Sequence, residues 1–147
     1  MEKIKELKIE AKLENIESAI RFINSLLEEH GCRVDVMQRI DLALEEMLVN
    51  ISQYAYEGIT GDAYVSVSFP EETLVQLDIR DKGVPYDPTK KEDPDVSIPL
   101  RQRKKGGLGI YMTKMVMDEM CYERKDGYNH TILRKNLPKD SSTYSET

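Results

Sequence analysis

The order of hydrophobic periodicities along this chain constrains its fold more than any other feature. Two successive segments repeat apolar residues at helical spacing, and strand-like alternation then returns in adjacent pairs. Strands that follow one another directly form hairpins, whereas strands that alternate with helices form parallel units. The pattern therefore predicts an α+β fold, a two-layer α/β sandwich in which one mixed sheet is covered on one face by helices.

The first half of the chain is expected to hold one strand and two helices. The strand covers residues 4–11 and is rich in lysine, which favours a sheet edge. The first helix is capped by Asn15 and stops at Gly31, and the second runs from about Val34 to Tyr56. The remaining expected elements are strands over 63–69 and 74–81, a helix from Leu108 with Ile110, Met112, Met115, Val116 and Met120 available for burial, and strands over 120–125 and 130–136.

Two tight turns and one long loop connect these elements. The Pro-Glu-Glu segment 70–72 is expected to turn the first hairpin, and the Asp-Gly pair 126–127 the second. Residues 82–107 carry four prolines, many charges and few apolar side chains, and we interpret them as a loop. Loops of this length inside a compact domain are usually functional.

Length and charge narrow the class of protein. The 147 residues suit one domain, which we expect to cover residues 1–137, followed by a disordered tail over 138–147. The net charge of −6 argues against direct contact with nucleic acid, whose phosphates need a positive surface. No apolar run approaches the roughly 20 residues that span a bilayer, and the N-terminus has no signal-peptide core. We therefore expect a cytoplasmic protein that contacts neither membrane nor DNA.

Glu46 and Asn50 lie four residues apart and therefore share one face of the second expected helix. An acid and a carboxamide stacked in this way can hold a divalent cation and orient a water molecule or a hydroxyl group. Taken alone, such a pair is more often a solvated helix flank, and Glu45 offers a second acid beside it.

Asp81 ends a strand in which alternate residues are apolar. That parity must face the helices, so the carboxylate of Asp81 is expected to point to the core side. Burial of a carboxylate is energetically unfavourable unless it is hydrogen-bonded, so Asp81 is a candidate functional residue. Gly83 and Pro85 follow and let the backbone turn sharply, and an aspartate that merely begins this turn is the competing interpretation.

A glycine-rich segment opens the third expected helix at residues 106–109, Gly-Gly-Leu-Gly. Glycines allow the backbone to approach a ligand closely, and the free N–H groups of a helix start favour phosphate. The preceding residues 101–105 add positive charge in an otherwise acidic protein. The segment is neither a P-loop nor a dinucleotide fingerprint, because no Gly-Lys-Ser/Thr follows it and no strand precedes it.

These signals occur in one order along the chain, and Thr131 follows them on the last strand. Together they supply a cation-holding pair, an inward acid that can accept a hydrogen bond from an amine, a long loop over 82–107 that can cover the site as a lid, and a phosphate cradle. A purine nucleotide with magnesium uses all four.

On these residues the chain resembles the ATP-binding superfamily shared by gyrase, the ninety-kilodalton heat-shock chaperones, histidine kinases and mismatch-repair MutL, which is called GHKL and has the Bergerat-type fold. Within it, the chain is most similar to the small anti-sigma factor serine/threonine kinases of bacterial sporulation and stress regulation. Residues 42–56 (LALEEMLVNISQYAY) resemble the N-box, and residues 81–88 (DKGVPYDP) the first glycine box. Residues 106–120 (GGLGIYMTKMVMDEM) resemble the second, and the likeness covers roughly residues 4–136.

The resemblance implies a role for each matching position. Glu46 would be the general base that activates the attacking hydroxyl group, and Asn50 would be the ligand of Mg²⁺. Asp81 would accept a hydrogen bond from the exocyclic amine of adenine. The other implied ATP-binding residues are Gly83 and Thr131 beside adenine and Lys105, Gly107, Leu108 and Gly109 around the phosphates.

The implied function is transfer of the γ-phosphoryl group of ATP to a serine or threonine of a small anti-anti-sigma (STAS-type) protein. The same domain, as a homodimer, would sequester a sigma factor, so that exchange of partners regulates transcription.

Two positions depart from the family pattern and keep alternatives open. Tyr54 stands where a histidine is usual, and Lys105 stands where an arginine is frequent and lacks its bidentate fork. One alternative is an ATP-binding regulatory protein that acts by sequestration alone, without phosphotransfer. The others are a detached histidine-kinase catalytic domain and an interaction module that binds no nucleotide.

Overall fold

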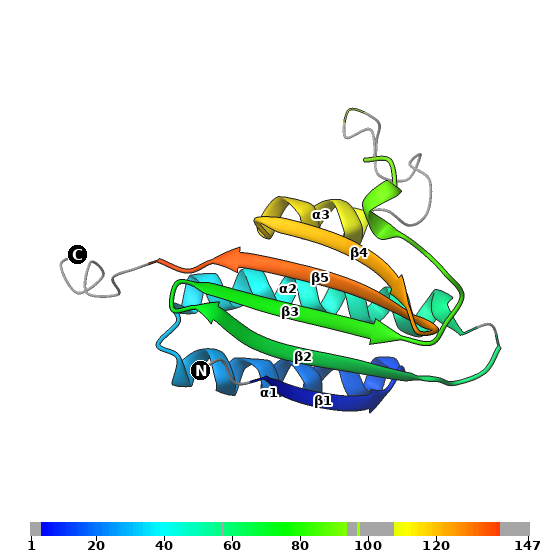
Figure 1. The fold of residues 1–147 in the computed structure, drawn as a ribbon, viewed down its shortest axis with the longest axis horizontal. Coiled ribbons are helices and arrows are strands. Elements are labelled where there is room, and N and C mark those ends of the chain that lie inside the picture. Colours follow the sequence, from blue (N-terminus) through cyan, green and yellow to red (C-terminus); the bar gives the residue numbers. More distant parts are fainter. Residues whose placement is uncertain (1–3, 57, 94–96, 98–107, 139–147) are drawn as a thin grey trace.

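The computed structural model describes residues 4–56, 58–93, 97 and 108–138. Five strands form one sheet in the order β1-β2-β3-β5-β4, and Figure 1 shows the helices on one face of it, with α2 between α1 and α3. The strands are β1 (Lys5–Glu10), β2 (Asp62–Glu71), β3 (Leu74–Asp81), β4 (Glu119–Lys125) and β5 (Tyr128–Asn136), and the helices are α1 (Ile16–Glu29), α2 (Val34–Asn50) and α3 (Leu108–Val116). The α+β two-layer sandwich is confirmed.

The sheet is antiparallel at every pairing of the described strands, and not mixed as expected. The reason lies in the connections. Between β1 and β2 the chain runs through two helices, and between β3 and β5 it runs through α3 and β4. In each case two elements intervene, and each element along the chain runs opposite to the one before it. The later strand of the pair therefore runs antiparallel to the earlier one.

The core lies between the helices and the inward parity of the sheet. Along β3 the burial alternates as expected, so that every second side chain from Val75 to Asp81 is buried. The largest fully buried side chains are Ile23, Leu27, Ile40, Leu44, Leu48, Val65, Val67, Val75, Leu77, Ile79, Thr113 and Leu133. Within the described residues, no helix has both the length and the apolar character needed to cross a bilayer.

The backbone confirms two of the expected chain reversals and corrects a third. Gly31 has φ +83° after the end of α1, and Asp126 and Gly127 have φ +53° and +82° in the β4–β5 turn. The first hairpin turns at residues 72–73 and not at 70–72. Pro70 instead lies in a shift of the β2–β3 register, where its missing N–H costs no ladder bond.

Asn15 does not cap α1 through its side chain. A short 3-10 turn, Leu13–Asn15, leads into the helix, and Asn15 Nδ2 donates to the carbonyl oxygen of Glu10 at 3.0 Å. The side chain therefore ties the helix start to the end of β1. The expected tail lies outside the described residues from position 139 onward.

A polar pair joins the two long helices. Asn24 Nδ2 on α1 donates to Asp41 Oδ2 on α2 at 3.0 Å, whereas the buried Asn24 Oδ1 and Asp41 Oδ1 have no hydrogen-bond partner. Burial raises the pKa of Asp41, the bond from Asn24 lowers it, and the charge of Glu45 raises it further. Two neighbouring acceptors without a donor are unfavourable while Asp41 is ionised.

We expect Asp41→Asn to raise the melting temperature at neutral pH, because two carboxamides can exchange two hydrogen bonds. Since the folded-state pKa of Asp41 is raised, its contribution to stability is full below the unfolded pKa and is lost as the pH rises through the folded pKa. The variant avoids that loss, so its gain should be about 1 kcal/mol, or roughly 3 °C, at pH 7 and should shrink toward pH 4.

Thermal unfolding of this variant between pH 4 and pH 7 checks the expectation. Glu123→Gln removes one charge at an exposed position of β4 and serves as the control. A gain that is equal at all pH values, or a loss at pH 7, would contradict it.

Candidate functional site

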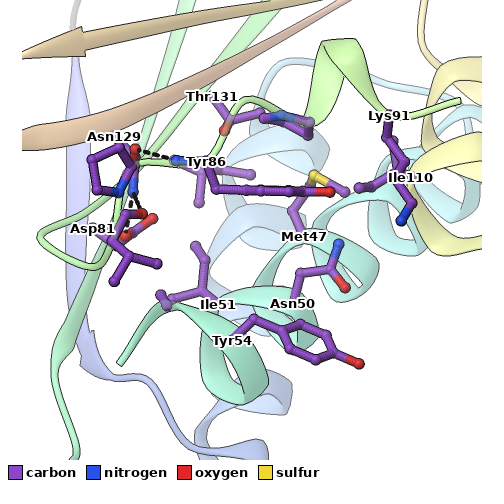
Figure 2. Close-up of a pocket in the computed structure, with 15 residues that line it drawn as sticks. Met47, Asn50, Ile51, Tyr54, Asp81, Tyr86, Lys91, Ile110, Asn129 and Thr131 are labelled. Carbon is purple, nitrogen blue, oxygen red and sulfur yellow. Dashed lines mark hydrogen bonds between the residues drawn. The ribbon is translucent and has the colours of Figure 1, made fainter. Parts of the chain in front are cut away.

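A cavity of about 490 Å³ opens between the C-terminal part of α2, the strands β3 and β5, and the segment that follows β3. Figure 2 shows the side chains that line it. Most of the wall is apolar, and a few polar groups converge on it, which is typical of a small-molecule site. The polar or charged lining residues are Asn50, Tyr54, Asp81, Tyr86, Lys91, Asn129 and Thr131.

Asp81 faces inward at the end of β3, as the strand parity predicted, and is 5% exposed. Its Oδ1 accepts from Gly83 N and from Asn129 Nδ2, both at 2.9 Å. No group in the described part of the chain donates to Oδ2, so this oxygen is available to a ligand. Burial raises the pKa of Asp81, while the bonds from Asn129 and Gly83 and the charge of Arg124 lower it.

Asn129 links Asp81 to the segment that follows β3, and it was not predicted from the sequence. It is 4% exposed and lies opposite Asp81 in the β3–β5 register. Its Nδ2 also donates to the carbonyl oxygen of Val84 at 2.9 Å, and its Oδ1 accepts from Tyr86 N at 3.3 Å (Figure 2). One carboxamide thus fixes both Asp81 and the segment after β3. The signal was its inward parity two residues before Thr131, which was missed because the expected strand began at residue 130.

Gly83 allows the segment after β3 to pack closely against Ala55, at the end of the helical stretch that continues α2. A Cβ at this position would lie 2.4 Å from the carbonyl oxygen of Ala55 and 2.5 Å from its Cβ. Val84 N donates to that same oxygen at 3.0 Å. Gly83 therefore acts by close packing and by donating its N–H to Asp81.

The helical segment changes its geometry at the cavity. Regular α2 ends at Asn50 and continues as a π-helix over Ile51–Ala55, a form that is frequent at functional sites. The side chain of Asn50 lines the cavity and makes no hydrogen bond within the described residues. Tyr54, from the π-helix, stands at the rim and is 59% exposed.

Glu46 lies one turn before Asn50 and contacts the first turn of α3. A Cβ at Gly109 would lie 2.3 Å from Glu46 Oε2, so the bare backbone of α3 leaves room for this carboxylate. Burial raises the pKa of Glu46, and the charge of Glu45 adds to the rise. The two residues of the predicted pair therefore lie in different places: Asn50 lines the cavity, and Glu46 packs against α3.

The family model for the histidine kinase-like ATPase domain matches residues 9–135 of the chain. The chain belongs to this family. The match includes every candidate residue named above.

Two named relatives of this domain are protein kinases. Serine/threonine-protein kinase BtrW of Bordetella bronchiseptica is 29% identical over 102 residues, which are 69% of this chain and 72% of the relative. Serine-protein kinase RsbW of Bacillus cereus is 28% identical over 139 residues, which are 92% of this chain and 86% of the relative.

A solved structure supports the fold of the domain. The crystal structure of the RsbU and RsbW domains of Rv1364c from Mycobacterium tuberculosis superposes with a TM-score of 0.64 at 16% identity. The superposition covers 92% of this chain and 33% of that longer chain. The resemblance stated from the sequence motifs is thus confirmed at the level of family and fold.

The structure describes some of the remaining predicted residues and not others. Thr131 lines the cavity opposite Ile79 in the β3–β5 register. Leu108 and Gly109 form the first turn of α3, and neither lines the cavity. Lys105 and Gly107 lie outside the described residues.

Proposed function

We propose that this protein is an anti-sigma factor with ATP-dependent serine/threonine kinase activity toward an anti-anti-sigma partner, and that it regulates transcription by partner switching. The observation that carries the proposal is the buried Asp81, whose Oδ2 accepts no hydrogen bond from the described residues, in an apolar cavity of a histidine kinase-like ATPase domain. Relatives named as serine or serine/threonine kinases support the choice of acceptor.

The adenine ring of ATP would lie between the apolar walls of the cavity, with its exocyclic amine toward Asp81. Asp81 Oδ2 is the free acceptor for that amine, because Oδ1 is occupied by Gly83 and Asn129. The hydroxyl group of Thr131 is the nearby group that can bond a ring nitrogen. A hydrogen bond from the amine to a partly desolvated carboxylate is strong and selects adenine over bases that lack this donor.

Asn50 would hold Mg²⁺ together with the phosphates. In the described residues no cluster of three or more His, Cys, Asp or Glu side chains could hold a metal ion. A magnesium ion bound through one protein oxygen, substrate phosphates and water needs no such cluster. The carboxamide of Asn50, which no described residue bonds, fits that arrangement. When bound, the ion neutralises phosphate charge.

Phosphoryl transfer would then depend on positioning and on one base. Glu46 takes the proton of the partner's serine or threonine hydroxyl as its oxygen bonds to the γ-phosphorus. The bond from this phosphorus to the bridging oxygen breaks, and ADP is left. The N–H groups at the start of α3 would cradle the phosphates, with Gly107, Leu108 and Gly109 as the backbone and Lys105 as the cation.

The partners are proteins in this proposal. A STAS-type anti-anti-sigma protein is the substrate, and a sigma factor is held by a homodimer of this chain until the antagonist displaces it. We place this action in the cytoplasm. The net charge of −6 supports action through proteins and not through direct contact with DNA.

The direct test is incubation with labelled ATP, Mg²⁺ and the STAS-type protein encoded nearest its gene. We expect label on a serine or threonine of that protein. ATP binding without label would favour the second candidate, a regulator that binds ATP and acts by sequestration alone. Tyr54 at the cavity rim is the observation that keeps this candidate, because it replaces the usual histidine.

A further inference from the structure

Lys91 is a cation on the wall of the cavity to which the proposed mechanism gives no role. Among the described lining residues, only Lys91 and Asp81 carry a formal charge at neutral pH. Lys91 follows a short 3-10 turn, Pro88–Lys90, in the segment after β3. It was not predicted, because a lysine in a charge-rich loop without periodicity carries no distinguishing signal.

The backbone at Lys91 is fixed on both sides. Before it, Asp87 Oδ1 accepts from the backbone N of Thr89 at 2.9 Å and from its hydroxyl group at 2.5 Å, which caps the turn. From α3, Lys114 Nζ donates to the carbonyl oxygen of Lys91 at 3.2 Å and lies 3.5 Å from Asp93 Oδ1. The position of Lys91 is therefore tied to the helix at whose start the phosphates are proposed to bind.

The ammonium group of Lys91 has no acceptor and no acidic partner in the described part of the chain. Its neighbours differ in this respect, since Lys114 bonds Asp93 and Arg124 donates to the carbonyl oxygen of Gly83. Figure 2 shows the Lys91 side chain beside Ile110, with its ammonium turned to the side of the cavity where Asn50 lies. Lys91 is half-buried in the wall of the cavity, so an anion bound beside its ammonium would be screened less by water than at the open surface.

We propose that Lys91 binds the phosphate groups of the nucleotide. The inference rests on the proposed function and extends it with a residue from outside the family motifs. Within the described residues, Asp81 Oδ2 is an acceptor without a donor at one end of the cavity, and the ammonium group of Lys91 is a donor without an acceptor at the other. A ligand with an amine on a flat ring and an anionic chain satisfies both ends, whereas a neutral nucleoside satisfies only the first.

The experiment compares Lys91→Met with Lys90→Met, an exposed lysine one residue earlier that does not line the cavity. Calorimetry with Mg²⁺ measures the affinities for ATP and for adenosine. We expect Lys91→Met to weaken ATP about tenfold and to leave adenosine within about twofold, because only ATP carries the anion. Lys90→Met should leave both ligands within about twofold, and Lys91→Arg should recover most of the ATP affinity.

The outcomes separate the inference from the proposed function. If the wild-type protein binds no ATP, both fall. If it binds ATP and Lys91→Met binds ATP equally well, the inference is overturned and the proposed function stands. An equal loss of ATP and adenosine also overturns it, because Lys91 would then shape the cavity and not contact phosphate. The melting temperature of each variant without ligand shows whether its fold is intact.

Discussion

Asp81→Asn is expected to lower the affinity for ATP by about 100-fold while the fold is retained. The substitution preserves shape but fixes the wrong group toward the ligand. Gly83 N and Asn129 Nδ2 both donate to Oδ1, so an asparagine here must place its own oxygen at that position. Its NH₂ group then takes the place of Oδ2 and meets the donor amine of adenine, so that two donors face each other.

A matched variant and a modified ligand make this test specific. Asp78→Asn changes the same residue type on the other face of β3, where Asp78 pairs with His130 at 3.2 Å, and should leave the affinity for ATP unchanged. A purine nucleotide without the exocyclic amine should bind the wild type and Asp81→Asn with similar affinity. Undiminished ATP affinity in Asp81→Asn would show that ATP does not use this cavity as proposed, and would favour a module that binds no nucleotide.

Local sequence patterns predicted the inward carboxylate of Asp81, because the alternation of a strand decides to which face of the sheet each side chain points. The alternation along β3 is set by burial, so the inward direction of Asp81 followed from its neighbours alone. Asn129 could not be found in the same way. Its role depends on the pairing of β3 with β5, two strands that are far apart in the chain, and a register between such strands is fixed by the packing of the whole sheet.

The third helix shows where a prediction from residue type fails. Met115 was expected in the core together with other apolar residues of this helix, but it is 66% exposed. The buried positions of α3 are Ile110 and Thr113, on the side of the helix that packs against α2, and Met117 is buried directly after its end. A short helix buries one stripe only, so the angular position of a residue decides its burial before its polarity does. Thr113 is tolerated there because its hydroxyl group donates to the carbonyl oxygen of Gly109 at 2.9 Å.

Glu46→Gln is expected to reduce phosphotransfer by about 100- to 10 000-fold while the affinity for ATP changes by no more than about threefold. Glutamine fills the same space against Gly109 but cannot take a proton from the partner's hydroxyl group. Single-turnover transfer of label from ATP to the STAS-type partner, beside calorimetry with ATP alone, separates chemistry from binding. Equal losses of rate and affinity would assign Glu46 to nucleotide binding and not to proton removal.

Glu45→Gln is the matched control, and it carries an expectation of its own. Glu45 is exposed, and its charge helps to raise the pKa of Glu46. A general base works only when it is deprotonated, so the rate should rise with pH through the pKa of Glu46. Without the charge of Glu45 that pKa falls, so the acidic limb of the pH–rate profile should move to lower pH while the rate at pH 7 stays near the wild-type value. A structural role of Glu46 would leave the limb unmoved. Because the charge of Glu45 also raises the pKa of Asp41, a shift that persists in an Asp41→Asn background assigns the limb to Glu46.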